Sequence, residues 1–153
     1  MTSDREYDER LGVPLRWWVQ GTMLVASLWL ATVVALPGLG AWIVTALALG
    51  LLALALVSYG SARIRVAGGE LRAGRAHIGA AHVGRVNALD AEETRLTAGR
   101  DADARAFLLL RPYLKRSVRV EITDPADPAP YWLLSTRDPD RLARAITALH
   151  DLA

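Results

Sequence analysis

The sequence contains no cysteine, only one lysine and only three histidines. Without cysteine the chain forms no disulfide framework, no thiol nucleophile and no cysteine-ligated zinc site. The histidines His77, His82 and His150 form no His-x-x-x-His or Glu-x-x-His pattern, so no metal site is expected. A Gly-x-Ser-x-Gly nucleophile motif and a phosphate-cradling glycine loop are also missing. These absences predict a protein that is not an enzyme and holds no cofactor or metal.

Charged residues and histidine are missing from the whole stretch Trp17 to Ala62. Pro37-Gly38-Leu39-Gly40 divides it into apolar segments at about 17–36 and 39–59, and each is long enough for a helix that crosses ~30 Å of hydrocarbon. A core hairpin of a soluble protein would usually carry a polar stripe, and a cleaved signal peptide would follow a basic segment rather than an acidic one. We therefore predict two transmembrane helices joined by a turn.

Basic residues flank this stretch on both sides, and none lies in its central turn. They are Arg5, Arg10 and Arg16 before it, and Arg63, Arg65, Arg72 and Arg75 after it. Because basic residues stay on the cytoplasmic side, we predict a multi-pass protein of the cell membrane with both termini cytoplasmic.

Aromatic residues stand at the ends of the two apolar segments: Trp17, Trp18, Trp42 and Tyr59. Such rings prefer the headgroup level, so we expect them to be membrane-interface anchors. Trp29 lies within the first segment and is expected to face the second. Ala46 and Gly50 are four residues apart, a spacing that allows close helix approach, and packing within the hairpin would account for them.

Residues 63–153 carry 15 basic and 12 acidic side chains, a balance that argues against a nucleic-acid module. Alternating and apolar runs predict about seven short strands, at 63–66, 70–74, 77–78, 82–89, 105–110, 117–123 and 131–136. The charged stretch 90–103 is expected to be a loop. Asp138-Pro139 is typical of a helix start, and Leu142, Ile146 and Leu149 share one face of that helix. This order predicts a small antiparallel β-barrel or sandwich, similar to pleckstrin-homology-like domains and capped by the C-terminal α-helix.

The predicted organisation is therefore a cytoplasmic segment 1–16, a transmembrane hairpin 17–62 and a cytoplasmic domain 63–153, an α+β membrane protein. Gly12 and Pro14 argue against a long helix in the first segment. Tyr7, Leu11 and Val13 give it enough apolar content to favour docking on the domain or on the membrane surface over a frayed tail.

Three motifs resemble a known family. They are Tyr7-Asp8-Glu9-Arg10-Leu11-Gly12-Val13-Pro14, then Ile64 and Val66 leading into Gly69-Glu70-Leu71 and Gly74, and finally the long run from Asp124 to Pro139. Together they are similar to an actinobacterial family of small membrane proteins known as domain of unknown function 3093. The resemblance spans nearly the whole chain. It implies a membrane location and an architecture, and it implies no activity.

The third motif supplies a set of candidate structural residues: Asp124, Pro125, Asp127, Pro128, Pro130, Tyr131, Trp132, Ser135, Thr136, Arg137 and Pro139. Asp124 and Asp127 form either a carboxylate pair or two turns in which they accept hydrogen bonds from nearby amides, and the prolines favour turns. At least one of Tyr131 and Trp132 is expected in the core.

A basic group is the remaining candidate site: Arg111, Lys115, Arg116, Arg119 and Arg137. It either binds anionic lipid or a partner, or it is a solvated face near Glu121 and Asp124. We expect a non-catalytic, membrane-tethered adaptor that recruits a protein partner. The alternatives are an anionic-lipid sensor and an accessory subunit of a membrane enzyme or transporter complex. The expected partners are membrane lipids and a protein, with no nucleic acid, and the sequence is compatible with a homo-oligomer.

Overall fold

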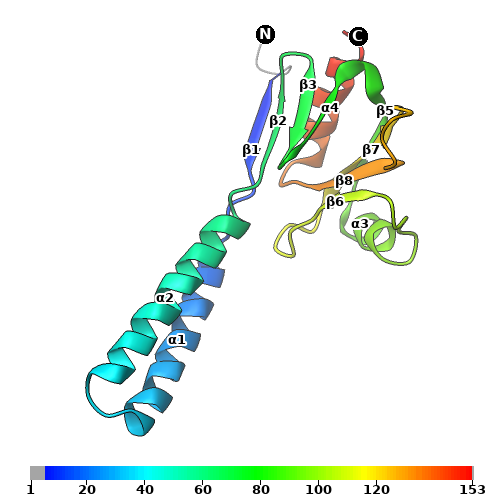
Figure 1. Cartoon of the computed structure of the whole chain (residues 1–153). Coiled ribbons are helices and arrows are strands. Elements are labelled where there is room, and N and C mark those ends of the chain that lie inside the picture. The colour runs from blue at the N-terminus through cyan, green and yellow to red at the C-terminus, as the bar shows by residue number, and fades with distance from the viewer. Residues whose placement is uncertain (1–5, 153) are drawn as a thin grey trace. The chain divides into compact units, whose positions relative to one another are not determined.

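The computed structural model describes residues 6–152, and the chain divides into two compact units. One unit is residues 12–61. The other joins residues 6–11 to residues 62–152, so it is assembled from two segments that are far apart in the sequence. Each unit is described by itself below, and Figure 1 labels their elements.

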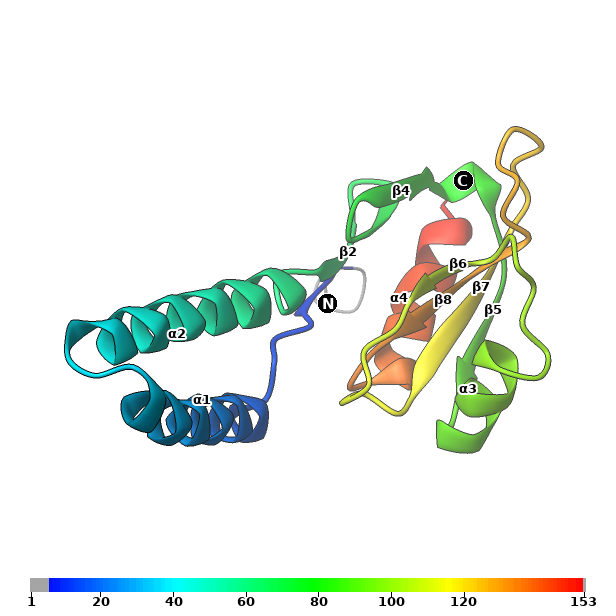
Figure 2. The same cartoon turned by 60° about the horizontal axis from the view of Figure 1, so that its bottom comes forward.

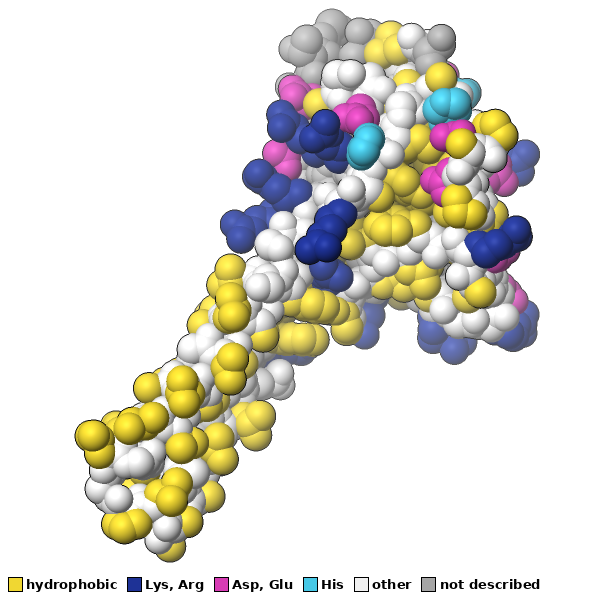
Figure 3. All heavy atoms as spheres, in the orientation of Figure 1, with side chains coloured by type: hydrophobic (Ala, Val, Ile, Leu, Met, Phe, Trp, Pro, Cys, Tyr) yellow, Lys and Arg dark blue, Asp and Glu magenta, His cyan; other side chains and the backbone are white. Residues whose placement is uncertain are grey.

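The first unit is a hairpin of two α-helices, α1 (Leu15–Ala35) and α2 (Leu39–Tyr59). Among their residues only Val25 and Ala41 are buried, and Figure 3 shows hydrophobic side chains over the visible surface of the hairpin. The hydroxyls of Thr22 and Thr45 bond to carbonyls of their own helices, which lets polar groups sit in an apolar medium. Both helices are long and apolar enough to cross a membrane.

The two helices approach each other at Gly21, where a Cβ atom would lie 2.8 Å from Leu52 Cδ1. Trp29 faces α2 as expected, with its ring centroid 5.7 Å from that of Trp42. The expectation that Gly50 packs within the hairpin is wrong, because nothing lies within 4 Å of its Cβ position. The close contact is made instead by a glycine of α1.

The second unit contains two four-stranded sheets and α4 (Pro139–His150). Sheet A is fully antiparallel and has the order β1 (Tyr7–Arg10), β2 (Arg63–Ala67), β3 (Glu70–Ala73), β4 (Ala76–Gly79). Its inward side chains, among them Ile64, Val66 and Leu71, are fully buried. Gly68 and Gly69 form the β2–β3 turn with φ angles of 60° and 80°, which residues with a Cβ rarely adopt.

Sheet B has the order β5 (Val83–Leu89), β7 (Ser117–Ile122), β8 (Tyr131–Ser135), β6 (Phe107–Leu109). Its β6 strand is parallel to β8, and the other pairs are antiparallel. Val118, Val120 and Leu134 pack in one core with Leu142, Ile146 and Leu149 of α4. Figure 2 shows α4 beside sheet B.

Of the two predicted alternatives, barrel or sandwich, the barrel is wrong, and so is the expectation that all strands pair antiparallel, because β6 is parallel to β8. A 3-10 turn, η1 (Ala80–His82), connects β4 to β5, and these two edge strands belong to different sheets, as do the edge strands β1 and β6. The α+β character, the strand-rich domain and the C-terminal helix are confirmed. Asp138 caps α4 by accepting a hydrogen bond from the Arg141 amide, and Pro139 is at the start of the helix.

The predicted loop at 90–103 is wrong in its first half, which forms α3 (Ala91–Ala98). The cause is a capping box: Asp90 Oδ1 accepts from the Glu93 amide at 2.8 Å, and Glu93 Oε2 accepts from the Asp90 amide at 2.9 Å. The helix is anchored to sheet B by the buried pair Thr94 and Ser117, whose hydroxyl oxygens are 2.8 Å apart.

Candidate functional site at the basic end of the sheet domain

The N-terminal strand β1 brings together the two points where the chain leaves and re-enters the sheet domain. It pairs with β2 in the register Asp8 with Arg65 and Arg10 with Arg63. Beyond the strands, the Leu11 amide donates to the Ala62 carbonyl at 2.9 Å. The Tyr113 hydroxyl donates to the Leu11 carbonyl at 2.6 Å. The ends of the hairpin therefore connect to adjacent positions of one domain.

The side chain of Glu9 fastens β1 to the end of sheet B. Its Oε2 accepts from the hydroxyls of Tyr7, at 2.7 Å, and Thr136, at 2.6 Å. Its Oε1 accepts from the Arg137 amide at 3.0 Å and from Arg137 Nη1 at 3.3 Å. Burial, followed by the hydrogen bond to Glu9 and its negative charge, raises the pKa of Tyr7 well above its ordinary value, against a lowering by the hydrogen bond to Thr136. The N-terminal segment thus docks on the domain, one of the two options that the sequence favoured.

Basic side chains from both sheets gather at this end of the domain. Arg10 and Arg63 are opposite each other at the strand ends, and the Gly74 amide donates to the Arg63 carbonyl, which puts Arg75 at the same edge. From sheet B, the Arg111 amide donates to Ser135 Oγ and Arg116 Nη2 donates to the Arg137 carbonyl. We call this set the basic end: Arg10, Arg63, Arg75, Arg111, Lys115, Arg116 and Arg137.

Carboxylates only partly balance the basic end. Asp8 lies 3.5 Å from Arg63, and Glu9 lies 3.3 Å from Arg137. Asp138 and Asp140 follow at the start of α4. Seven basic side chains against four carboxylates leave an excess of three positive charges at the point where the hairpin joins.

The structure brings four of the five predicted basic residues to this end and places the fifth elsewhere. Arg119 lies within β7, with its guanidinium carbon 4.3 Å from the centroid of the Tyr131 ring. Sequence reasoning used Arg10, Arg63 and Arg75 for orientation alone and missed them as site residues. Their position next to the uncharged stretch was the available signal.

The proline-rich motif builds turns and core contacts. Asp124 Oδ1 accepts from the Ala126 amide at 2.8 Å, and Asp127 Oδ1 accepts from the Ala129 amide at 2.9 Å, which is the geometry of turn-forming aspartates. Tyr131 and Trp132 are both buried. Among residues 6–152 no group of three or more His, Cys, Asp or Glu side chains could hold a metal ion.

Residues 6–146 match the family described as "Protein of unknown function (DUF3093)". The chain belongs to this family. The match covers the hairpin, both sheets and most of α4. No curated protein and no solved structure matches the chain.

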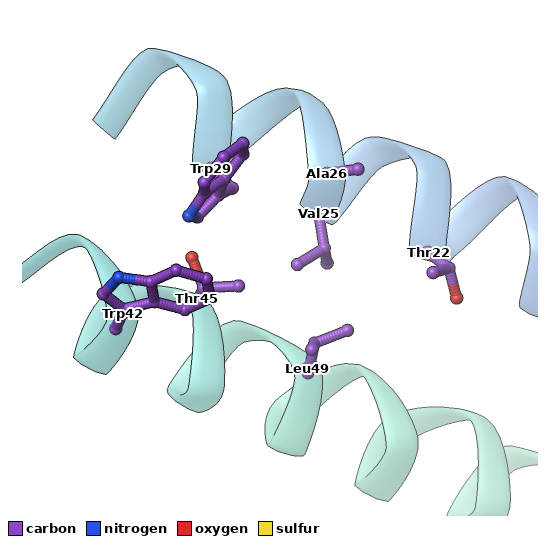
Figure 4. Close-up of a pocket in the computed structure, with 7 residues that line it drawn as sticks. All are labelled: Thr22, Val25, Ala26, Trp29, Trp42, Thr45 and Leu49. Atoms are coloured by element: carbon purple, nitrogen blue, oxygen red, sulfur yellow. The ribbon is translucent and has the colours of Figure 1, made fainter. Parts of the chain in front are cut away.

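The DUF3093 chain also has an apolar groove between its two long helices, shown in Figure 4. The groove has a volume of about 320 Å³ and is lined by Thr22, Val25, Ala26, Trp29, Trp42, Thr45 and Leu49. Trp29 Nε1 is buried and has no hydrogen-bond partner among residues 6–152. Trp42 was expected as a membrane-interface anchor, and no pattern in the sequence predicts the groove.

Proposed function

We propose that this DUF3093 protein is a membrane-anchored, non-catalytic binding module. Its hairpin crosses the bilayer twice, and its sheet domain stands on the cytoplasmic side with the basic end at the anionic headgroups. The single observation that carries this proposal is the attachment of the basic end to both ends of an uncharged hairpin whose apolar side chains are exposed. Exposed apolar surface of this extent needs an apolar medium to cover it.

The β1–β2 ladder supports the placement of both chain ends on one side of the membrane. Residues 7–10 precede the hairpin and residues 63–66 follow it, yet they form one antiparallel pair. Two strands cannot pair across a bilayer, so the hairpin has to cross an even number of times. The basic residues beside it then favour the cytoplasmic side, and the Pro37–Gly40 turn faces outward.

Covalent connection limits how far the basic end can lie from the headgroups. Arg63 is four residues after Tyr59, and Arg10 is five residues before Leu15. A fully extended chain covers at most ~3.6 Å per residue, so both positions stay within about 18 Å of the helix ends. Each lysine or arginine near an anionic leaflet contributes roughly 1 kcal/mol. The charge excess therefore supports docking of this end on anionic lipid, as in the lipid-sensing alternative.

The adaptor role is the second part of the proposal. Docking by the basic end leaves the remaining surfaces of the domain facing the cytoplasm, where a protein partner can bind. The charged outer surface of sheet A supports this role, because its side chains are exposed and occupied only by weak ion pairs.

The orientation is tested with single cysteines, which are informative because the chain has none of its own. A Gly40→Cys side chain is accommodated, since its Cβ would lie 3.7 Å from Leu36 Cβ. We expect an impermeant maleimide to label the Gly40→Cys variant in intact cells and to label Pro112→Cys only after permeabilisation. Labelling of both variants, or of Pro112→Cys alone, in intact cells would contradict the proposed topology.

Docking of the basic end is tested in nanodiscs with a fluorophore on Pro112→Cys, next to Arg111. The matched control is Ala126→Cys, in the β7–β8 connection at the opposite end of sheet B. We expect anionic lipid to shield the first label from a water-soluble quencher, and high salt to remove the shielding. Lys115→Gln should weaken docking by roughly 1 kcal/mol, about a fivefold change in the equilibrium. Equal quenching at both positions in every lipid would refute docking.

A further inference from the structure

Sheet A presents a row of basic side chains on the surface that faces away from the core, and it shares Arg10 and Arg63 with the basic end. Its outward side chains include Arg10, Arg63, Arg65, Arg72 and His77, and all are exposed. Arg65 is opposite Asp8 on one side and Arg72 on the other, and Arg72 is opposite His77. These side chains form a row across four strands at about 4.8 Å intervals. We call the surface formed by Arg63, Arg65, Arg72 and His77 the arginine face.

Two arrangements on this surface do not help the domain to fold. Arg10 is directly opposite Arg63, and Arg65 is directly opposite Arg72. Like charges at opposite positions of an antiparallel pair destabilise a sheet. Local arrangements that disfavour folding are expected at functional sites. The two pairs therefore suggest that the positive charge serves recognition.

The carboxylates beside these arginines form exposed ion pairs with them. Arg63 lies 3.5 Å from Asp8, Arg65 lies 3.9 Å from Glu6, and Arg72 lies 2.8 Å from Glu70. The hydrogen bond from Arg72 lowers the pKa of Glu70, so Glu70 is a carboxylate at neutral pH. All of these arginine side chains are more than half exposed, and exposed ion pairs contribute little to stability. A carboxylate of a partner can therefore replace Asp8, Glu6 or Glu70 as the ion-pair partner of an arginine at little cost in stability.

A hollow at the β2–β3 turn provides a defined binding position on the arginine face. It has a volume of about 370 Å³ and is lined by Arg65, Ala67, Gly68, Glu70 and Arg72. Gly68 lines it without a side chain, and nothing lies within 4 Å of its Cβ position. Two guanidinium groups border the hollow, and each can bind a carboxylate through two parallel hydrogen bonds.

We propose that an acidic segment of a partner protein docks across the arginine face, with one of its carboxylates in the hollow between Arg65 and Arg72. The inference rests on the proposed adaptor function and names the chemistry of the partner. A protein fits better than a nucleic acid, because carboxylates lie among the arginines of this surface and a protein segment can place a neutral or basic residue beside each of them. Asp8 and Glu70 would repel a nucleic acid, in which every nucleotide carries a phosphate, whereas an acidic segment can alternate its carboxylates with neutral residues.

The test uses the full chain in nanodiscs of zwitterionic lipid, where docking of the basic end on anionic lipid plays no part. The probe is a fluorescent peptide of alternating Glu and Thr, about 12 residues long, whose binding is followed by anisotropy at about 50 mM salt. Arg65→Gln with Arg72→Gln should weaken binding about tenfold or more. Arg85→Gln with Arg144→Gln removes the same charge from exposed positions elsewhere and should change binding less than about twofold. A Gln/Thr peptide should not bind.

Several results would overturn the proposal. They are no binding by the unmodified chain, equal weakening by both double variants, and tighter binding of a single-stranded oligonucleotide of the same charge. An oligomer that the first double variant alone dissociates would assign the face to a second copy. Circular dichroism checks folding, and the first double variant should keep its urea midpoint because it removes a like-charge pair. The peptide assay can fail while the Pro112→Cys assay succeeds, and the reverse, so the two proposals are tested separately.

Discussion

Glu9→Gln is the most informative single substitution in the sheet domain. Its carboxylate accepts from four donors, the Tyr7 and Thr136 hydroxyls and two nitrogens of Arg137. The Glu9 side chain is only 11% exposed, so water can replace few of these bonds. Glutamine keeps the shape, but it loses the charge and points an NH2 group at two of the donors.

The expected loss can be worked out from these contacts. Hydrogen bonds to a charged group contribute about 1.5–3 kcal/mol each, and an unpaired buried donor costs about 1–3 kcal/mol. Because the four bonds share one carboxylate and are not additive, we expect a loss of about 3 kcal/mol in the free energy of unfolding. With a urea dependence of about 1.5 kcal/mol/M for a domain of this size, the midpoint should fall by about 2 M.

Urea denaturation of the full chain in detergent, followed by circular dichroism of the sheet, measures this shift. Asp8→Asn is the matched control on the same strand. Its carboxylate is 41% exposed and 3.5 Å from Arg63, so its loss should cost below about 1 kcal/mol. Equal midpoints for the two variants would refute the view that Glu9 fastens β1 to the domain.

Two further predictions concern the same domain. The raised pKa of Tyr7 means that the folded state keeps a proton that the unfolded state releases near pH 10. The contribution of Tyr7 to stability should therefore be constant below about pH 10 and fall above it. Tyr7→Phe should flatten this alkaline decline in urea midpoints measured against pH, and an unchanged decline would contradict the assignment. Asp90→Ala should cost about 1 kcal/mol by removing the capping box of α3, measured as a lower urea midpoint, whereas Asp101→Ala, at an exposed position after the helix, should change it little.

Local signals were sufficient for the elements whose cause lies within a few residues. The uncharged stretch predicts the hairpin, because the cost of charge in hydrocarbon acts on each residue separately. Gly68-Gly69 predicts the β2–β3 turn through its positive φ angles. Asp138-Pro139 and the spacing of Leu142, Ile146 and Leu149 predict α4.

Non-local pairing is what the sequence could not show. β1 is a charged strand of four residues, and its partner β2 begins more than 50 residues later, so no local pattern links them. No local sequence pattern indicates the parallel pairing of β6 with β8 either. Since β1 brings Arg10 to Arg63, three of the seven residues of the basic end were hidden for the same reason. The helix α3 differs, because Asp90 and Glu93 are a capping-box signature that could have identified it.

The β1–β2 ladder also has a consequence for the order of synthesis. Residues 7–10 are made first and stay without a partner until the whole hairpin and then residues 63–66 have emerged. In a membrane, a chain that inserted only one of its two helices would leave these segments on opposite sides, and sheet A would lack its edge strand and the Glu9 contacts. If the hairpin spans the membrane as proposed, completion of sheet A therefore requires both crossings, and a chain that inserted only one helix would leave the edge of β2 without its partner strand.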